Sequence, residues 1–171
     1  MMYSKLLFIF CLFFGSLFLY NCGGSPKAEV KISLKNLLFE GKEADFGTAS
    51  IRTIIKINID SILKANKATK ISKAKLSDLS LRVKGSENFD LLSNITLQFL
   101  EKDTKSMSIA NASKIASKTA KLSPTMSEKA DAKDFFQKGT FEALIDLNLK
   151  DETSEEKVSI LADFDCTLFL Q

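Results

Sequence analysis

The stretch VSILADFDCTLFLQ, residues 158–171, alternates apolar and polar side chains along its length. The apolar side chains occupy every second position: Val158, Ile160, Ala162, Phe164, Cys166, Leu168 and Leu170. Because successive side chains of a β-strand point to opposite faces, this pattern predicts a strand with one face in a core and the other in water. Such one-sided strands are typical of antiparallel sheets.

The same period-two pattern recurs along the chain and predicts further strands. The segments are EVKISLK (29–35), IRTIIKINID (51–60), LSDLSLRVK (76–84), NITLQFLEK (94–102), KSMSIANA (105–112) and TFEALIDLNLK (140–150), with one more short strand near residues 118–122. In segment 51–60 the inward positions are expected to be Ile51, Thr53, Ile55, Ile57 and Ile59. No long helical period separates these segments, so a parallel βαβ sheet is not expected.

Two short helices are predicted between the strands. DSILKANK (60–67) can be capped by Asp60 or Ser61, and DAKDFFQKG (131–139) begins at Asp131 and ends at Gly139. Together, the segments predict an all-β fold: an antiparallel two-sheet β-sandwich of seven or eight strands with one or two short helices.

The N-terminus carries the pattern of a signal peptide. Lys5 precedes an uncharged apolar run over residues 6–20, which is shorter than the roughly 20 residues that span a bilayer. The run ends in Leu19 and Tyr20, and Asn21, Cys22 and Gly-Gly-Ser follow it. This end resembles the lipobox of bacterial lipoproteins, and asparagine before the cysteine resembles the relaxed version found in spirochaetes. Tyr20 and Asn21 depart from the common small-residue pattern.

The resemblance implies cleavage between Asn21 and Cys22 and acylation of Cys22. The chain then divides into a signal peptide (1–21), a lipidated flexible tether (22–29) and a single β-sandwich domain (30–171). Gly23 stands where an aspartate commonly retains lipoproteins in the inner membrane. By that resemblance, the expected location is the cell envelope, lipid-anchored in the outer membrane of a two-membrane bacterium.

The body of the chain carries a second resemblance. The segments INID (57–60), ISKAKLSDLSLRV (71–83), NFDLLSNITLQF (88–99) and DAKDFFQKGTFEALIDLNL (131–149) occur in this order. They are similar to a group of small, uncharacterised bacterial β-sandwich proteins, often lipoproteins, over about residues 48–171. The resemblance implies a jelly-roll-like sandwich, and the group has no catalytic residues to carry over.

The chain lacks the residues that several common kinds of catalytic, metal-binding and phosphate-binding site require. There is no histidine, which is the commonest general base and transition-metal ligand. Besides Cys11, inside the predicted signal, only Cys22 and Cys166 could ligate zinc through sulfur. No glycine-rich phosphate loop follows a strand. We therefore expect no catalytic residue, no metal, no cofactor and no enzymatic activity, with Cys166 as a small buried core residue.

Acidic side chains give weak evidence for a metal-binding or catalytic site. Asp163 and Asp165 lie on the polar face of the last strand, and Asp146 could lie across from them. Three carboxylates could hold calcium or act as an acid/base pair, but they lack the spacing of a calcium loop. The favoured interpretation is a solvated strand face. The same interpretation applies to Asp78, Glu87 and Asp90.

Lysines cluster between Ser61 and Ser77, where no acidic residue occurs. The cluster consists of Lys64, Lys67, Lys70, Lys73 and Lys75. It is either an ordinary solvated surface or a patch for anionic lipid, glycan or a protein partner. Nucleic acid is not an expected partner, because no aromatic side chains are interleaved and the chain is predicted to be exported.

The expected function is that of a membrane-anchored envelope lipoprotein with a non-catalytic binding or structural role. One alternative is a carrier that holds an apolar ligand between the sheets. A further alternative is a carboxylate-based enzyme acting on glycans, which the lack of tryptophan and the scarcity of tyrosine disfavour. The sequence names no ligand and no oligomeric state.

Overall fold

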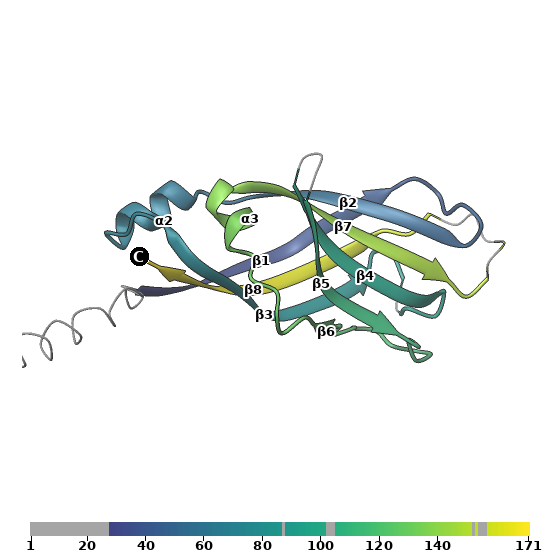
Figure 1. Cartoon of the computed structure of the whole chain (residues 1–171). Helices are drawn as coiled ribbons and strands as arrows, with labels where there is room; N and C mark the ends of the chain where they lie inside the picture. Colours follow the sequence, from purple (N-terminus) through teal and green to yellow (C-terminus); the bar gives the residue numbers. More distant parts are fainter. Residues whose placement is uncertain (1–27, 87, 102–104, 152, 154–156) are drawn as a thin grey trace, which may run out of the picture.

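The computed structural model (Figure 1) describes residues 28–86, 88–101, 105–151, 153 and 157–171. Its elements are β1 (Ala28–Gly41), β2 (Thr48–Lys56), α2 (Ile59–Ala65), β3 (Ile71–Val83), β4 (Leu92–Glu101), β5 (Lys105–Ser113), β6 (Thr125–Met126), α3 (Lys133–Lys138), β7 (Thr140–Leu149) and β8 (Ile160–Leu170).

The strands are all antiparallel and follow the order β3-β8-β1-β2-β7-β4-β5-β6. β1 pairs with β8 from Ala28 to Phe39 and then with β2 through Glu40 and Gly41. This change of partner divides the order into a β3-β8-β1 layer and a β2-β7-β4-β5-β6 layer, which diverge from the crossing point (Figure 1). The predicted all-β, antiparallel, jelly-roll-like sandwich with short helices is therefore confirmed.

The two layers also meet along their other edge. The backbone N–H of Leu81 in β3 donates to the Leu122 carbonyl at 2.8 Å, and Leu122 donates back at 3.0 Å. Nearer α3, the N–H of Ala132 donates to the carbonyl of Ala74 at 3.0 Å. These bonds satisfy part of the β3 edge, which would otherwise present free backbone groups for pairing with another chain.

A cluster of phenylalanines fills the space between the layers beneath α3. Phe99 of β4 is central to it, with ring centroids 4.8 Å from Phe141, 5.8 Å from Phe135, 6.2 Å from Phe164 and 6.4 Å from Phe136. All five side chains are buried. Since aromatic pairs at these separations add to the free energy of area burial, this cluster is a main source of stability.

The strands run between two ends of the sandwich, which we call the entry end and the loop end. At the entry end, Ala28 begins β1 opposite Leu170 of β8, and Leu170 lies opposite Ile71 of β3. The connection through α2 lies at the same end (Figure 1). At the opposite loop end, four loops join β1 to β2, β3 to β4, β5 to β6 and β7 to β8.

Both predicted helices occur, with changes at their N-termini. α2 begins at Ile59, and Asn58 is its cap through a 3.0 Å bond from the N–H of Ser61 to the asparagine oxygen, so Asp60 and Ser61 are not the cap. The predicted strand 51–60 is accordingly wrong beyond Lys56. At the end of α3, Gly139 has a φ of 71°, as predicted for a stop glycine.

Other strand boundaries differ because the pattern is interrupted. β3 begins at Ile71 and not near residue 76, with register shifts between Ile71 and Lys73 and between Leu76 and Asp78 that break the period of two. The strand predicted near 118–122 is wrong, since only Leu122 forms an isolated bridge. Ala28 and Glu29, assigned to the tether, belong to β1.

Candidate functional site

The predicted cleavage and lipidation residues, Asn21 and Cys22, lie outside the described residues, as do the signal peptide and tether residues 22–27. The first described residue is Ala28, at the entry end. Among the described residues, no helix is long and apolar enough to cross a membrane.

The structure brings the five lysines of the predicted cluster to this same end. Lys64 lies in the last turn of α2, and Lys67 follows the helix with a φ of 52°. Lys70 pairs with the C-terminal residue, since its N–H donates to the Gln171 carbonyl at 3.1 Å and Gln171 donates back at 2.9 Å. These bonds fix the α2–β3 connection beside the end of β8.

The remaining two lysines stand on the outer face of β3. Lys73 lies opposite Phe169 of β8, which lies opposite Glu29 of β1. In the row of Thr167, Lys75 of β3 and Lys31 of β1 flank that threonine. All five lysine side chains of the cluster are exposed. We call the five residues Lys64, Lys67, Lys70, Lys73 and Lys75 the lysine surface.

No member of the lysine surface forms an ion pair with a described carboxylate. The middle of the same layer is different. There, Lys35 pairs with Asp165 at 2.9 Å and Arg82 pairs with Asp163 at 3.4 Å. The cations in the middle of the layer are thus neutralised within the fold, whereas those of the entry end are left for solvent or a partner.

The predicted acidic face is a hydrogen-bonded strand surface. The carboxylate of Asp165 accepts from the Ser33 hydroxyl at 2.6 Å and from Lys35, and these bonds lower its pKa. The same bond to Asp165 raises the pKa of Lys35. Asp78 lies opposite Asp165 across the strand pair. No group of three possible metal ligands occurs among the described residues.

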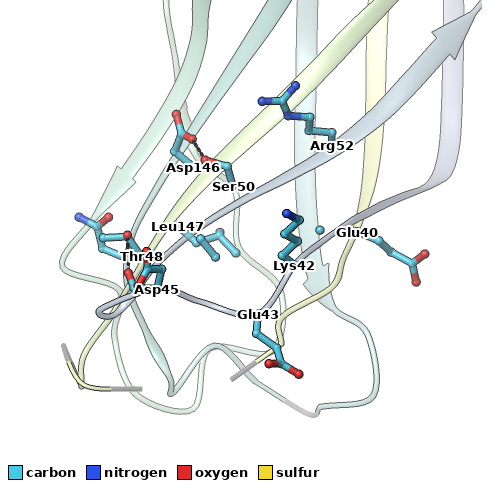
Figure 2. A pocket seen from close by; sticks show the side chains of 12 residues that line it. Glu40, Lys42, Glu43, Asp45, Thr48, Ser50, Arg52, Asp146 and Leu147 are labelled. Atoms are coloured by element: carbon cyan, nitrogen blue, oxygen red, sulfur yellow. Dashed lines mark hydrogen bonds between the residues drawn. The ribbon is translucent and has the colours of Figure 1, made fainter. Parts of the chain in front are cut away.

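Asp146 does not lie across from Asp163 and Asp165, because β7 belongs to the other layer. Its carboxylate accepts from Ser50 at 2.6 Å and from Gln98 at 2.9 Å. It borders a surface hollow of about 700 Å³ where β1 crosses to β2 (Figure 2).

The polar groups of this hollow largely bond to one another or to their neighbours. Arg52 pairs with Glu142 at 3.2 Å, and Thr48 donates to the Asp45 carbonyl at 2.8 Å. In Figure 2, the side chains of Glu40 and Glu43 extend away from Asp146. Thr48, Ser50, Arg52 and Asp146 therefore all have hydrogen-bond or ion-pair partners within the fold.

Cys166 lies in the core, as the alternation predicts. Its side chain is 2% exposed, and burial raises the pKa of the thiol to about 12. A thiol with such a pKa is almost entirely protonated at neutral pH, so it is a poor nucleophile. Cys166 is a packing residue and does not form a reactive site.

A second hollow, of about 620 Å³, lies between β3 and the segment after β6. Leu76, Ile109, Met126 and Ala130 line it together with Lys75, Ser127 and Glu128. None of the core phenylalanines contributes to it, and the space between the layers beneath α3 is filled by their rings. The predicted carrier function gains no support from this hollow.

The structure exposes two large apolar side chains that the sequence pattern does not predict to be exposed. At the loop end, Phe46 is 84% exposed and Leu91 is 49% exposed. The two flank the end of β7, since Leu149 donates to the Gly47 carbonyl at 2.7 Å and Lys150 donates to the Leu91 carbonyl at 2.9 Å. The sequence gives only a weak signal for this turn, because Gly47 favours a turn but phenylalanine is not a preferred first residue of a two-residue hairpin loop.

No known protein-family model matches this sequence, and no curated protein sequence matches it. Solved structures do resemble the fold. The infectious bursal disease virus VP2 subviral particle is similar over 85% of this chain and 34% of that chain, at 9% identity and a TM-score of 0.47. The C-terminal domain of a chitobiase from Bacteroides fragilis is similar over 70% and 65%, at 14% identity and a TM-score of 0.34.

A third similar structure is the capsid of Helicobacter pylori bacteriophage KHP30, over 82% of this chain and 93% of that chain, at 11% identity and a TM-score of 0.34. The chain spans about a third of the infectious bursal disease virus chains that it matches. These likenesses concern the arrangement of strands and carry no information on function.

Proposed function

We propose that this chain is an exported lipoprotein, acylated on Cys22, whose β-sandwich is held at a membrane of the cell envelope by its entry end. The proposal starts from the lipobox-like Leu19–Cys22 and the apolar run before it. With Gly23 after the cysteine, the proposed location is the outer membrane of a two-membrane bacterium. The proposed role is binding or structural, and not catalytic.

The observation that supports this proposal best is the place of Ala28. Cys22 precedes Ala28 by six residues, which span at most about 20 Å when fully extended. An acylated Cys22 would therefore hold the entry end close to the bilayer. Two or three acyl chains on one residue anchor a protein stably, whereas one chain binds only marginally. The four loops of the loop end would then point away from the membrane, where a partner can reach them.

Mass spectrometry of the protein extracted from bacterial envelopes with detergent tests the proposal. The expected N-terminal peptide begins at Cys22 and carries the mass of a diacylglycerol and an acyl chain. The Cys22→Ala variant should lose the modification and leave the membrane fraction. An unmodified peptide that includes residues before Cys22 would overturn the proposal.

The partner can be sought by crosslinking in intact envelopes with the acylated protein, using Cys22→Ala as the control. A protein or glycan captured only by the anchored form would be a partner that requires membrane location. The carrier and glycan-enzyme alternatives stay predictions, and no described feature favours either over binding.

A further inference from the structure

We propose that the lysine surface binds the anionic headgroups of the membrane that carries the anchor, and so sets the orientation of the sandwich. This inference rests on the proposed function, because acylation of Cys22 is what brings a bilayer to the entry end. It adds a second contact, made by the folded domain itself, to the covalent one.

The length of chain between anchor and domain supports a membrane as the occupant. Six residues reach at most about 20 Å, which is about two and a half Debye lengths at physiological ionic strength. A bilayer surface held at Cys22 therefore comes within range of the lysines at the entry end when the tether is less than fully extended. Tethering also raises the effective concentration of headgroups at this surface without any further contact.

The charge of the surface matches that occupant. The five side chains are exposed, and none pairs with a described carboxylate. Lys31 adds a sixth positive charge beside Thr167. The nearby acids are Glu29 in the row of Phe169, Asp60 in the first turn of α2, Asp131, whose carboxylate accepts from the N–H of Ala74, and Glu128, which lines a hollow with Lys75. Positive charge therefore remains in excess at this end. Each lysine close to an anionic membrane strengthens binding about fivefold, so several together give a measurable affinity.

The backbone under the surface is also fixed in advance. Thr69 and Lys70 both donate to the Gln171 carbonyl, at 2.6 Å and 3.1 Å, and Ala68 donates to Leu63 of α2 at 2.9 Å. Headgroup binding therefore needs to order only the lysine side chains and not the loop that carries them.

The test uses the chain from residue 22 onward with Cys22→Ser, which retains every described residue and needs no acylation. Binding is measured by co-sedimentation with vesicles of phosphatidylcholine, with and without phosphatidylglycerol. We expect binding only to the anionic vesicles, and we expect it to weaken as salt is added. Replacing all five residues of the lysine surface with glutamine should reduce the partition coefficient at least about tenfold.

A matched control removes the same charge from the loop end. Five exposed lysines of that end are chosen: Lys42, Lys114, Lys118, Lys121 and Lys150. Replacing them with glutamine should change the partition coefficient less than about twofold, because the inference assigns the vesicle contact to the entry end. Thermal unfolding of both variants should match that of the parent chain, since every altered side chain is exposed.

Four outcomes would overturn the inference. They are absence of binding to anionic vesicles, equal losses in the two variants, unchanged binding by the entry-end variant, and binding to a soluble anionic polysaccharide in place of the vesicles. None of these outcomes depends on acylation, which mass spectrometry of Cys22 measures separately. An acylated protein that fails the vesicle test would keep the proposed function and lose this inference.

Discussion

The two ends of the sandwich both expose lysines, and they differ in their exposed apolar side chains. The entry end carries the lysine surface on backbone tied to the C-terminal residue, and the phenylalanine cluster lies in the half of the core that α3 covers. The loop end exposes Phe46 on a two-residue turn. At the same end Phe89, in the loop between β3 and β4, is fully buried, which shows that residue type alone does not assign a role.

The largest expected effect comes from a substitution in the phenylalanine cluster beneath α3. Phe99→Ala removes a ring in contact with Phe135, Phe136, Phe141 and Phe164, so it should lower the free energy of unfolding by about 3–5 kcal/mol. Guanidinium chloride unfolding followed by far-ultraviolet circular dichroism measures this loss. A loss below about 1 kcal/mol would mean that the cluster is not closely packed.

Cys166→Ser is expected to have the next largest effect. The hydroxyl would lie in the apolar core without a strong partner, and the expected loss is about 1–3 kcal/mol in the free energy of unfolding. Cys166→Ala is the control, since it removes the sulfur without adding a polar group. In the native protein, a thiol reagent at neutral pH should react with Cys166 only after denaturation. Rapid labelling of the folded chain would contradict the buried position.

The sequence accounts for most of this core and for less of the surface. Strict alternation from Val158 to Leu170 predicts β8, and Cys166 faces inward as expected. The start of β3 was missed because two register shifts place neighbouring residues out of phase. In β2, Ile54 points outward and is 63% exposed, whereas its neighbour Ile55 points inward and is buried. The number of apolar residues in the segment does not distinguish the two.

The position of the candidate site also could not be predicted from local sequence patterns. The acid-free lysine run is visible in the sequence, but its position beside Ala28 depends on the pairing of β3 with β8 and of β8 with β1. Those contacts join residues roughly a hundred or more positions apart, and local periodicity contains no information about them. Asp146 was assigned to the wrong layer for the same reason.

A smaller effect is expected at the loop end. Phe46 has a φ of 47° and Gly47 a φ of 71°, so both central residues of the turn adopt the left-handed conformation. Asparagine tolerates that conformation better than phenylalanine, and Phe46 buries little surface. Phe46→Asn should therefore leave the free energy of unfolding unchanged or raise it by up to about 1 kcal/mol. A clear loss, measured by the same denaturation as for Phe99→Ala, would show that Phe46 packs within the fold.

The smallest expected effect concerns the ion pair between Lys35 and Asp165, which the unpaired lysine surface lacks. Bonds from Ser33 and Lys35 hold the pKa of Asp165 below its usual value, so the folded state binds this proton more weakly than the unfolded state. The stabilisation is present above the unfolded pKa of about 3.9 and is lost as pH falls through the lower folded pKa. Asp165→Asn should remove this small component of acid sensitivity.

Unfolding of Asp165→Asn and of the parent chain at a series of pH values from neutral to acidic measures that difference. The two curves should converge as pH falls. Lys70→Gln serves as the comparison, because Lys70 has no described acidic partner and its variant should show no such difference. Parallel curves for Asp165→Asn and the parent would contradict the role of the pair.

The most direct test of the central claim asks which end of the acylated protein faces the bilayer. Lys70→Cys at the entry end and Lys150→Cys at the loop end each offer one exposed thiol for a fluorescent label. In vesicles that contain anionic lipid and a headgroup-linked quencher, we expect strong quenching at residue 70 and little at residue 150. Equal quenching at both positions, or stronger quenching at residue 150, would contradict the account.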